Sequence, residues 1–151
     1  MSVEIRELAW ADARGEDLRL AQRAELTIRY ETPDSEPGPA PTAADIALFL
    51  VAFDDDEAIA CGGIRPIDEH HGEVKRMYVV PDRRGSGVAT QVLRALEAAG
   101  RERGWNRLVL ETGERQPDAI RFYEREGYTR IPNFGHYLHS PISLCYERRL
   151  D

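Results

Sequence analysis

Cysteine is scarce in this sequence and follows no metal-binding or redox pattern. The 151 residues include two cysteines, Cys61 and Cys145, which lie far apart along the chain. Zinc sites and thiol redox motifs place their cysteines only a few residues apart. We therefore expect both thiols to be reduced and partly buried.

Long hydrophobic runs are also absent. No apolar run approaches the roughly 20 residues that a membrane-spanning helix needs. The first residues, MSVEIREL, mix acidic and apolar side chains and lack the basic and then apolar order of a signal peptide. These absences predict a cytoplasmic protein without a membrane partner.

Positive charge is in deficit, with 20 Lys and Arg residues against 27 Asp and Glu residues and a formal net charge of −7. Proteins that bind nucleic acids generally need a basic face, so we expect no nucleic-acid partner. An acidic balance is compatible with attracting cationic amines, but solubility alone also explains it.

Histidine is the remaining candidate metal ligand, and only four histidines are present. His70 and His71 are adjacent, and His136 and His139 lie close together, but neither pair has a convincing third ligand. Because zinc is usually held by three or four protein ligands, we expect no metal here. Solvated loop residues, or residues that line a pocket, are the simpler interpretation.

What the sequence does contain is typical of a globular domain. Hydrophobic residues make up 42% of the chain and charged residues 31%. A chain of this length can bury one sizeable core, so we expect a single domain over residues 1–151.

The N-terminal third predicts one strand followed by helical structure and a loop. Residues 3–8 alternate between apolar and polar side chains, as a half-buried strand does. Residues 12–30 read as one or two helices, whose inward candidates are Leu18, Leu20, Leu26 and Ile28. Residues 31–45 are rich in proline and acidic side chains and predict a loop.

The central segment predicts three consecutive strands, at residues 46–53, 58–67 and 73–80. Short polar turns join them, which indicates an antiparallel meander. Pro81 ends the third strand, because proline cannot donate a hydrogen bond to the sheet.

The pattern then changes to helical spacing at residues 87–103, followed by a strand at 107–112 and a helix at 116–127. Two short closing strands are expected at residues 128–132 and 143–150. A strand–helix–strand connection implies that the strands at 73–80 and 107–112 pair in parallel.

The loop that precedes the helix at 87–103 has the composition of a phosphate-binding loop. Gly85 and Gly87 allow the main chain to approach a ligand closely, while Arg83 and Arg84 add positive charge near a helix N-terminus. This combination suits a diphosphate. The alternative is an ordinary glycine turn capped by Ser86. The sequence contains neither the G-x-x-x-x-G-K-[ST] motif of P-loop proteins nor the G-x-G-x-x-G motif of dinucleotide folds.

Two motifs together resemble the GNAT superfamily of acetyl-CoA-dependent N-acetyltransferases. The stretch RGSGVA at residues 84–89 matches the family signature [QR]-x-x-G-x-[GA], and Pro81 follows a strand that ends in MYV. Downstream, QPDAIRFYEREGY resembles N-x-x-A-x-x-x-Y-x-x-x-G-[FY], in which Gln116 takes the usual Asn position. The matching residues of this second motif are Ala119, Tyr123, Gly127 and Tyr128.

The resemblance implies a mixed α/β fold with a mostly antiparallel sheet of about six or seven strands and about four flanking helices. One parallel pair of strands, the fourth and fifth, would splay apart to open the active cleft. The cosubstrate would be acetyl-CoA. Its pyrophosphate would lie on Arg84, Gly85, Ser86, Gly87, Val88, Ala89 and Thr90, and its pantetheine arm along Met77, Tyr78 and Val79. Gln116 would hydrogen-bond the pantetheine arm, although its side chain is one methylene longer than Asn.

The resemblance also implies two catalytic residues. Tyr123 matches the tyrosine that lies beside the sulfur and acts as general acid, with an aromatic anchor between helix and sheet as the alternative role. Glu73 begins the strand that carries the pantetheine and is the expected general base. Its alternative role is a strand-end acid paired with Lys75 or His71.

The acceptor would be the primary amine of a small molecule, which attacks the thioester directly in a ternary complex. Tyr30 and Arg65 are candidate acceptor residues, and Arg65 would bind a carboxylate if the acceptor is like an amino acid. Residues 134, 136, 137 and 139 belong to the same expected region. Alternatives are acetylation of a protein lysine or N-terminus, a non-catalytic acyl-CoA sensor, and an acyl-carrier role for Cys61. A homodimer is possible by analogy with similar proteins.

Overall fold

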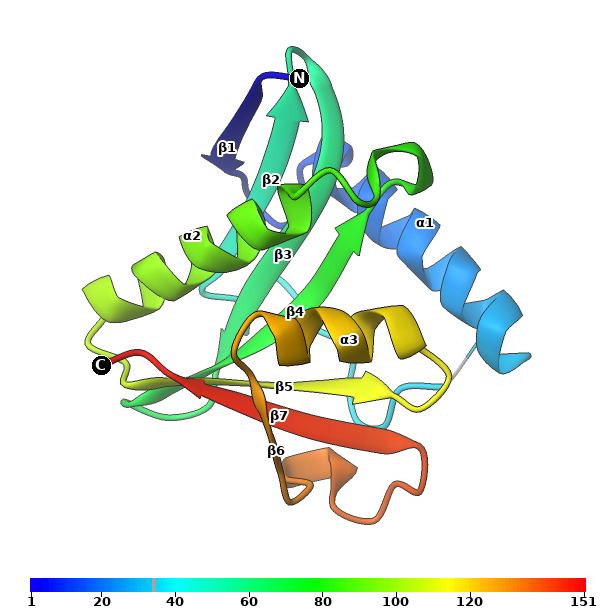
Figure 1. Ribbon diagram of the computed structural model, residues 1–151, viewed down its shortest axis with the longest axis vertical. Helices are drawn as coiled ribbons and strands as arrows, with labels where there is room; N and C mark the ends of the chain where they lie inside the picture. Colours follow the sequence, from blue (N-terminus) through cyan, green and yellow to red (C-terminus); the bar gives the residue numbers. More distant parts are fainter. Residues whose placement is uncertain (34) are drawn as a thin grey trace.

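The apolar segments found in the sequence form the strands of one seven-stranded sheet in the computed structural model, which describes residues 1–33 and 35–151 (Figure 1). The strands are β1 (Val3–Glu7), β2 (Leu48–Asp54), β3 (Glu57–Pro66), β4 (His71–Val79), β5 (Arg107–Gly113), β6 (Thr129–Ile131) and β7 (Ser143–Arg149). The helices are α1 (Ala13–Tyr30), α2 (Val88–Glu102) and α3 (Pro117–Arg125), with single 3₁₀ turns η1 (Pro81–Arg83) and η2 (Gly135–Tyr137).

The sheet has the mixed topology that the sequence predicts. Its strand order is β1-β2-β3-β4-β5-β7-β6. The predicted meander β2–β3–β4 is antiparallel throughout, and β4 pairs in parallel with β5. The remaining pairs, β1–β2, β5–β7 and β6–β7, are antiparallel. The fold class is therefore confirmed.

Both faces of the sheet are covered, which explains why β2 is apolar without alternation. Leu48 and Leu50 pack in the larger core with α2 and α3, while Phe49, Val51 and Phe53 pack in a second core with α1. Figure 1 shows α2 and α3 on one face of the sheet and α1 behind it. Val80, just after β4, packs against both cores.

The segment 12–30 forms one helix rather than two, so the described residues contain three α-helices instead of about four. Asp12 caps α1 by accepting a hydrogen bond from the Arg14 N–H. Leu18 is buried as predicted, but Leu20 and Ile28 are 56% and 79% exposed, so these two expectations were wrong. Residues two apart on a helix point to opposite sides, and the face of α1 that contains Leu18 packs against the sheet.

Among the helices that the described residues form, none combines the length and the apolar character required to cross a membrane.

Candidate functional site

A cleft opens where β4 and β5 stop pairing. The two parallel strands are in register only over His71–Glu73 and Arg107–Val109. Beyond these residues the strands diverge, as Figure 1 shows, and α3 lies across the opening. The rest of β4 therefore has a main-chain edge with no partner strand on the β5 side.

A bulge in β4 lies where the strands diverge. Cys61 of β3 faces Tyr78, whereas Gly63 faces Lys75, so β4 has one residue more than β3 between these two pairs. Arg76, inside the bulge, has φ 60°, a left-handed conformation that is uncommon for residues other than glycine. An extra residue of this kind bends a strand and locally increases its twist. The bulge thus gives β4 the bend that accompanies its separation from β5.

The cleft encloses about 700 Å³, including its open mouth. Residues 74–77 of β4 and 111–113 of β5 form two of its walls, and α1, α3 and the loop before β2 supply the others. Four of the site residues that the sequence predicts line it: Tyr30, Met77, Gln116 and Tyr123. Tyr78 instead packs in the core beneath α1, and Val79 packs against the larger core.

The glycine loop lies at the C-terminal end of β4 and leads into α2. Gly85 and Gly87 have φ 79° and 89°, and no described atom lies within 4 Å of the place where a Cβ would stand. Among the described residues, the N–H groups of Gly85, Ser86 and Gly87 have no acceptor. The N–H groups of the first helical turn, residues 88–90, have no partner within the helix either. The loop is therefore an open cradle of main-chain donors at the positive end of a helix dipole.

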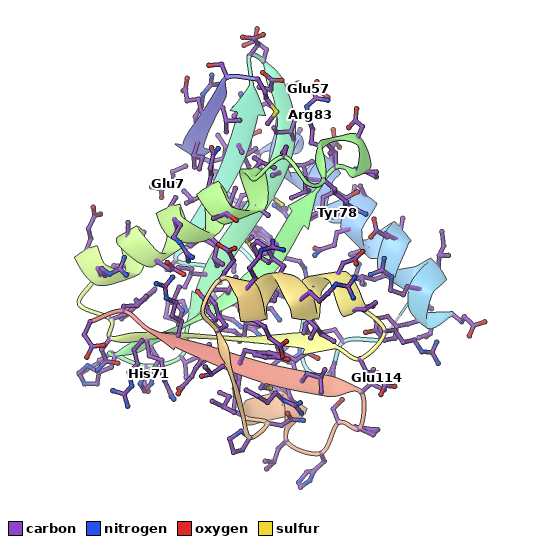
Figure 2. All side chains as sticks on the ribbon, viewed as in Figure 1. Glu7, Glu57, His71, Tyr78, Arg83 and Glu114 are labelled. Carbon is purple, nitrogen blue, oxygen red and sulfur yellow. The ribbon has the colours of Figure 1, made fainter. Side chains whose placement is uncertain are left out.

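The two arginines before this loop have different surroundings. Arg83 pairs with Asp54 at 3.4 Å and Glu57 at 3.2 Å; Figure 2 shows Glu57 and Arg83 together near the β2–β3 turn. Arg84 donates to the Val79 carbonyl at 3.0 Å and to Glu25 of α1 at 2.7 Å. Arg84 thus joins the loop, β4 and α1, and its side chain remains 43% exposed beside the cradle.

Tyr123 points from α3 into the cleft. It is buried, unlike the half-buried Phe122 next to it, and its ring meets Phe122 and Tyr128 edge to face. Burial raises the pKa of the Tyr123 phenol above its ordinary value, so the group keeps its proton at neutral pH. A protonated phenol in the cleft can donate that proton to a leaving group.

Glu73 lies outside the cleft lining, in a buried network of charges. Its carboxylate accepts from the Tyr137 hydroxyl at 2.6 Å and from Arg65 at 3.3 Å, and it lies 3.7 Å from the Lys75 ammonium. The Glu73 side chain is 5% exposed. The partners of this carboxylate thus include Lys75, one of the two that the sequence suggested, while His71 pairs with Asp68 instead.

Glu111, which the sequence analysis did not single out, is the carboxylate of β5 that faces the cleft. The Ser143 hydroxyl donates to it at 2.6 Å, and no Lys or Arg among the described residues lies within ion-pair distance. Burial raises the pKa of the Glu111 carboxyl above its ordinary value. Its signal in the sequence is weak: it is one acid at the end of the otherwise apolar run LVLE.

Tyr30 and Gln116 meet at the far end of the cleft. The Gln116 amide lies 3.4 Å from the Tyr30 hydroxyl, which joins the last turn of α1 to the start of α3. A side chain at Gly113 would overlap the Tyr30 hydroxyl, so only glycine fits there. The last turn of α1 is thereby held against the end of β5.

Arg65 does not reach the cleft. It pairs with Glu73 and with Asp45, 3.7 Å away, and donates to the Pro39 carbonyl at 3.3 Å. Because these partners already bind the guanidinium outside the cleft, the position of Arg65 does not support its candidate role in binding the acceptor.

The residues that line the cleft include no cysteine or histidine among those that the structure describes. Cys61 is buried, and burial raises the pKa of its thiol to about 12, so very little reactive thiolate forms near neutral pH. Within the described part of the chain, no three His, Cys, Asp or Glu residues are grouped as a metal site. The acyl-carrier role for Cys61 therefore has no structural support.

Comparison with known proteins gives concordant matches. Residues 3–128 match the family model described as the acetyltransferase (GNAT) family. An IAA acetyltransferase of Azospirillum brasilense is 38% identical over 103 residues, which are 68% of this chain and 67% of that protein. A Klebsiella pneumoniae crystal structure, named as an acyl-CoA N-acyltransferase, is 33% identical with a TM-score of 0.83 and covers 99% and 98% of the two chains. The fold also matches a GNAT family acetyltransferase of Elizabethkingia anophelis with acetyl-CoA bound, at 16% identity, TM-score 0.71 and 97% coverage of both chains.

Proposed function

The chain belongs to the GNAT acetyltransferase family and is an acyltransferase, and from this premise we propose that residues 1–151 act as one N-acetyltransferase domain. The proposed reaction moves an acetyl group from acetyl-CoA to the primary amine of a small molecule while both substrates are bound. The observation that carries this proposal is the cleft between β4 and β5, where a buried phenol and a carboxylate face one space.

The glycine loop is the proposed site for the pyrophosphate of acetyl-CoA. Support comes from the unpaired N–H groups of residues 85–87, the N-terminus of α2, and the open space around both glycines. The edge of β4 at residues 77–79, which has no partner strand on the β5 side, is the proposed track for the pantetheine arm. The matching Elizabethkingia anophelis fold holds acetyl-CoA, which supports the same assignment.

The proposed chemistry requires two proton transfers. The amine nitrogen forms a bond to the thioester carbon, the C–S bond breaks, and the thiolate leaves with the bonding electron pair. Glu111 takes the proton that the nitrogen loses, and Tyr123 gives its proton to the departing sulfur. Exchange with water then restores both groups.

Glu111 replaces Glu73 as the proposed general base because of position. Glu111 lines the cleft and has no cationic partner in the part of the chain that the structure describes, whereas the Glu73 carboxylate is already bound by Arg65 and Tyr137. A carboxyl with a raised pKa is also a stronger base once ionised. We assign Glu73 a positioning role, through Lys75 and Tyr137.

The experiment that tests this function compares two alanine variants of matched strain. Gly85 and Gly104 both have φ 79° with open space around them, but Gly104 lies at the other end of α2. Each substitution forces an L-residue into left-handed backbone and should cost about 1–2 kcal/mol of stability.

Thermal unfolding with and without saturating acetyl-CoA should separate them. At about 100 times the dissociation constant, ligand should stabilise the wild type by roughly 2.7 kcal/mol, a rise of about 5–10 °C. G104A should keep this rise and G85A should lose most of it. CoA release on adding amines then separates an enzyme from a sensor. No rise in the wild type, or equal loss in both variants, would refute the site.

A further inference from the structure

The acceptor side of the cleft holds two buried cations that share one partner from a loop. Lys75 and Arg76 line the cleft, with side chains 4% and 10% exposed. Both bind the carboxylate of Glu36, at 3.0 Å in each case, and Glu36 is itself 29% exposed. Cations removed from water need an anion close by, and here a loop residue supplies it.

The bulge in β4 is what brings these cations together. Neighbouring residues of a regular strand point to opposite faces, so Lys75 and Arg76 would not normally reach one carboxylate. The left-handed conformation of Arg76 breaks that alternation. Backbone strain of this kind is typically retained at functional sites, because the surrounding structure has to maintain it.

Glu36 separates two cavities. A second cavity of about 520 Å³, including its open mouth, lies under the loop and shares Gln22, Leu26, Ser35, Glu36 and Arg76 with the main cleft. Arg65 of β3 holds the loop through the Pro39 carbonyl at 3.3 Å and the Asp45 carboxylate at 3.7 Å. Moving the Glu36 carboxylate aside would join the cavities, free the Arg76 guanidinium and leave Lys75 with Glu73 and the Tyr137 hydroxyl.

Hydrogen-bond acceptors for an amine lie in the same cleft. Gln22 donates its amide to the Met77 carbonyl at 2.8 Å, while its own Oε1 is buried without a donor among the described residues. Glu111 is the second acceptor. The cleft therefore offers paired cations for an anion and separate acceptors for an ammonium group.

We propose that the acceptor is an amine that carries a carboxylate, such as an α-amino acid, and that its carboxylate binds Lys75 and Arg76 in the place of Glu36. This inference rests on the proposed function and specifies its substrate class. Arg76, with its fixed fork of donors, binds the carboxylate, and Lys75 adds a point charge. The amine then points toward Gln22 and Glu111.

The test measures CoA release with the twenty common L-amino acids, each beside its α-amide, which keeps the amine but lacks the anionic carboxylate. At least one acid should exceed its amide in kcat/KM by about 100-fold, consistent with a charge-assisted pair worth roughly 2–3 kcal/mol. R76Q should reduce this ratio at least tenfold through KM. R107Q, which removes an arginine paired with Glu147 outside the cleft, should keep it.

A binding measurement decides the matter even if turnover is slow. E36Q leaves Lys75 and Arg76 without their loop carboxylate, so the best acid should raise its melting temperature more than that of the wild type. The matching amide should raise neither. Equal effects of acids and amides, or no effect of any acid on E36Q, would overturn this inference. If acetyl-CoA fails to stabilise the wild type, the proposed function itself has failed.

Discussion

The glycine loop and the charged wall of the cleft, which we propose bind acetyl-CoA and the acceptor, are built from different materials. The glycine loop offers main-chain N–H groups and needs little more than two left-handed glycines. The cleft wall carries the buried Lys75 and the half-buried Glu36, and Lys75 also lies near Glu73, which is buried outside the lining. On the proposed assignment, main-chain groups hold the shared cosubstrate, whereas selection of the acceptor depends on buried charge.

The largest effect that we expect is a loss of folding stability when the charged wall loses its buried partner Glu73. E73Q removes the carboxylate that Arg65, Lys75 and Tyr137 share, and should lower the free energy of unfolding by about 3 kcal/mol. The melting temperature should fall by roughly 6–12 °C. E4Q, which breaks only the exposed pair with Arg6, should change little.

Calorimetry of both variants at neutral pH checks this expectation. If E73Q unfolds like the wild type but loses turnover that high pH partly restores, Glu73 is the general base. Its assignment as a structural partner of the charged wall is then wrong.

The next largest effect is on the reaction rate, through Tyr123 in the cleft. Y123F removes the proposed proton donor and should lower kcat by about 30–100-fold, within the usual range for a general acid. The apparent affinity for acetyl-CoA should stay within about twofold. Y146F removes another buried tyrosine hydroxyl, one bound to Glu124 outside the cleft, and should leave kcat unchanged. Steady-state kinetics that gave both variants the same kcat would reduce Tyr123 to an aromatic anchor.

The smallest effect is a pH dependence at Glu111. Since burial raises the folded-state pKa of this carboxyl, the stability it contributes is fully present below its unfolded pKa and is lost as pH rises through the folded pKa. E111Q should therefore melt at a slightly higher temperature than the wild type at pH 8 and at the same temperature near pH 4.

Activity should depend on pH in the opposite direction to stability. Because ionised Glu111 is the proposed base, kcat/KM should rise as this carboxyl loses its proton. The acid limb of the wild-type kcat/KM profile should be missing from E111Q, whose remaining activity is lower. An acid limb that survives in E111Q would assign the base to another group.

The same contrast explains what the sequence could predict. The glycine loop and Tyr123 are predictable because local motifs encode them, and the order of the meander β2–β3–β4 follows from periodicity and short turns. Glu36 and Gln22 are not, because their partners on β4 lie 39 and 55 residues away and depend on packing. The prediction for Leu20 was wrong because the spacing of apolar residues indicates a helix but does not show which of its faces packs against the sheet.

The bulge at Arg76 joins the course of β4 and the charge of the cleft in one residue. The backbone of this residue interrupts the β3–β4 register, while its side chain lines the cleft. Deleting a single residue here would restore an unbroken ladder and simultaneously remove the bend in β4 and the paired cations. Surface loops accept insertions and deletions readily, but any insertion or deletion at Arg76 should alter both the sheet and the cleft. On the proposed assignment, acceptor choice can change through side-chain replacement and through the length of the loop that carries Glu36.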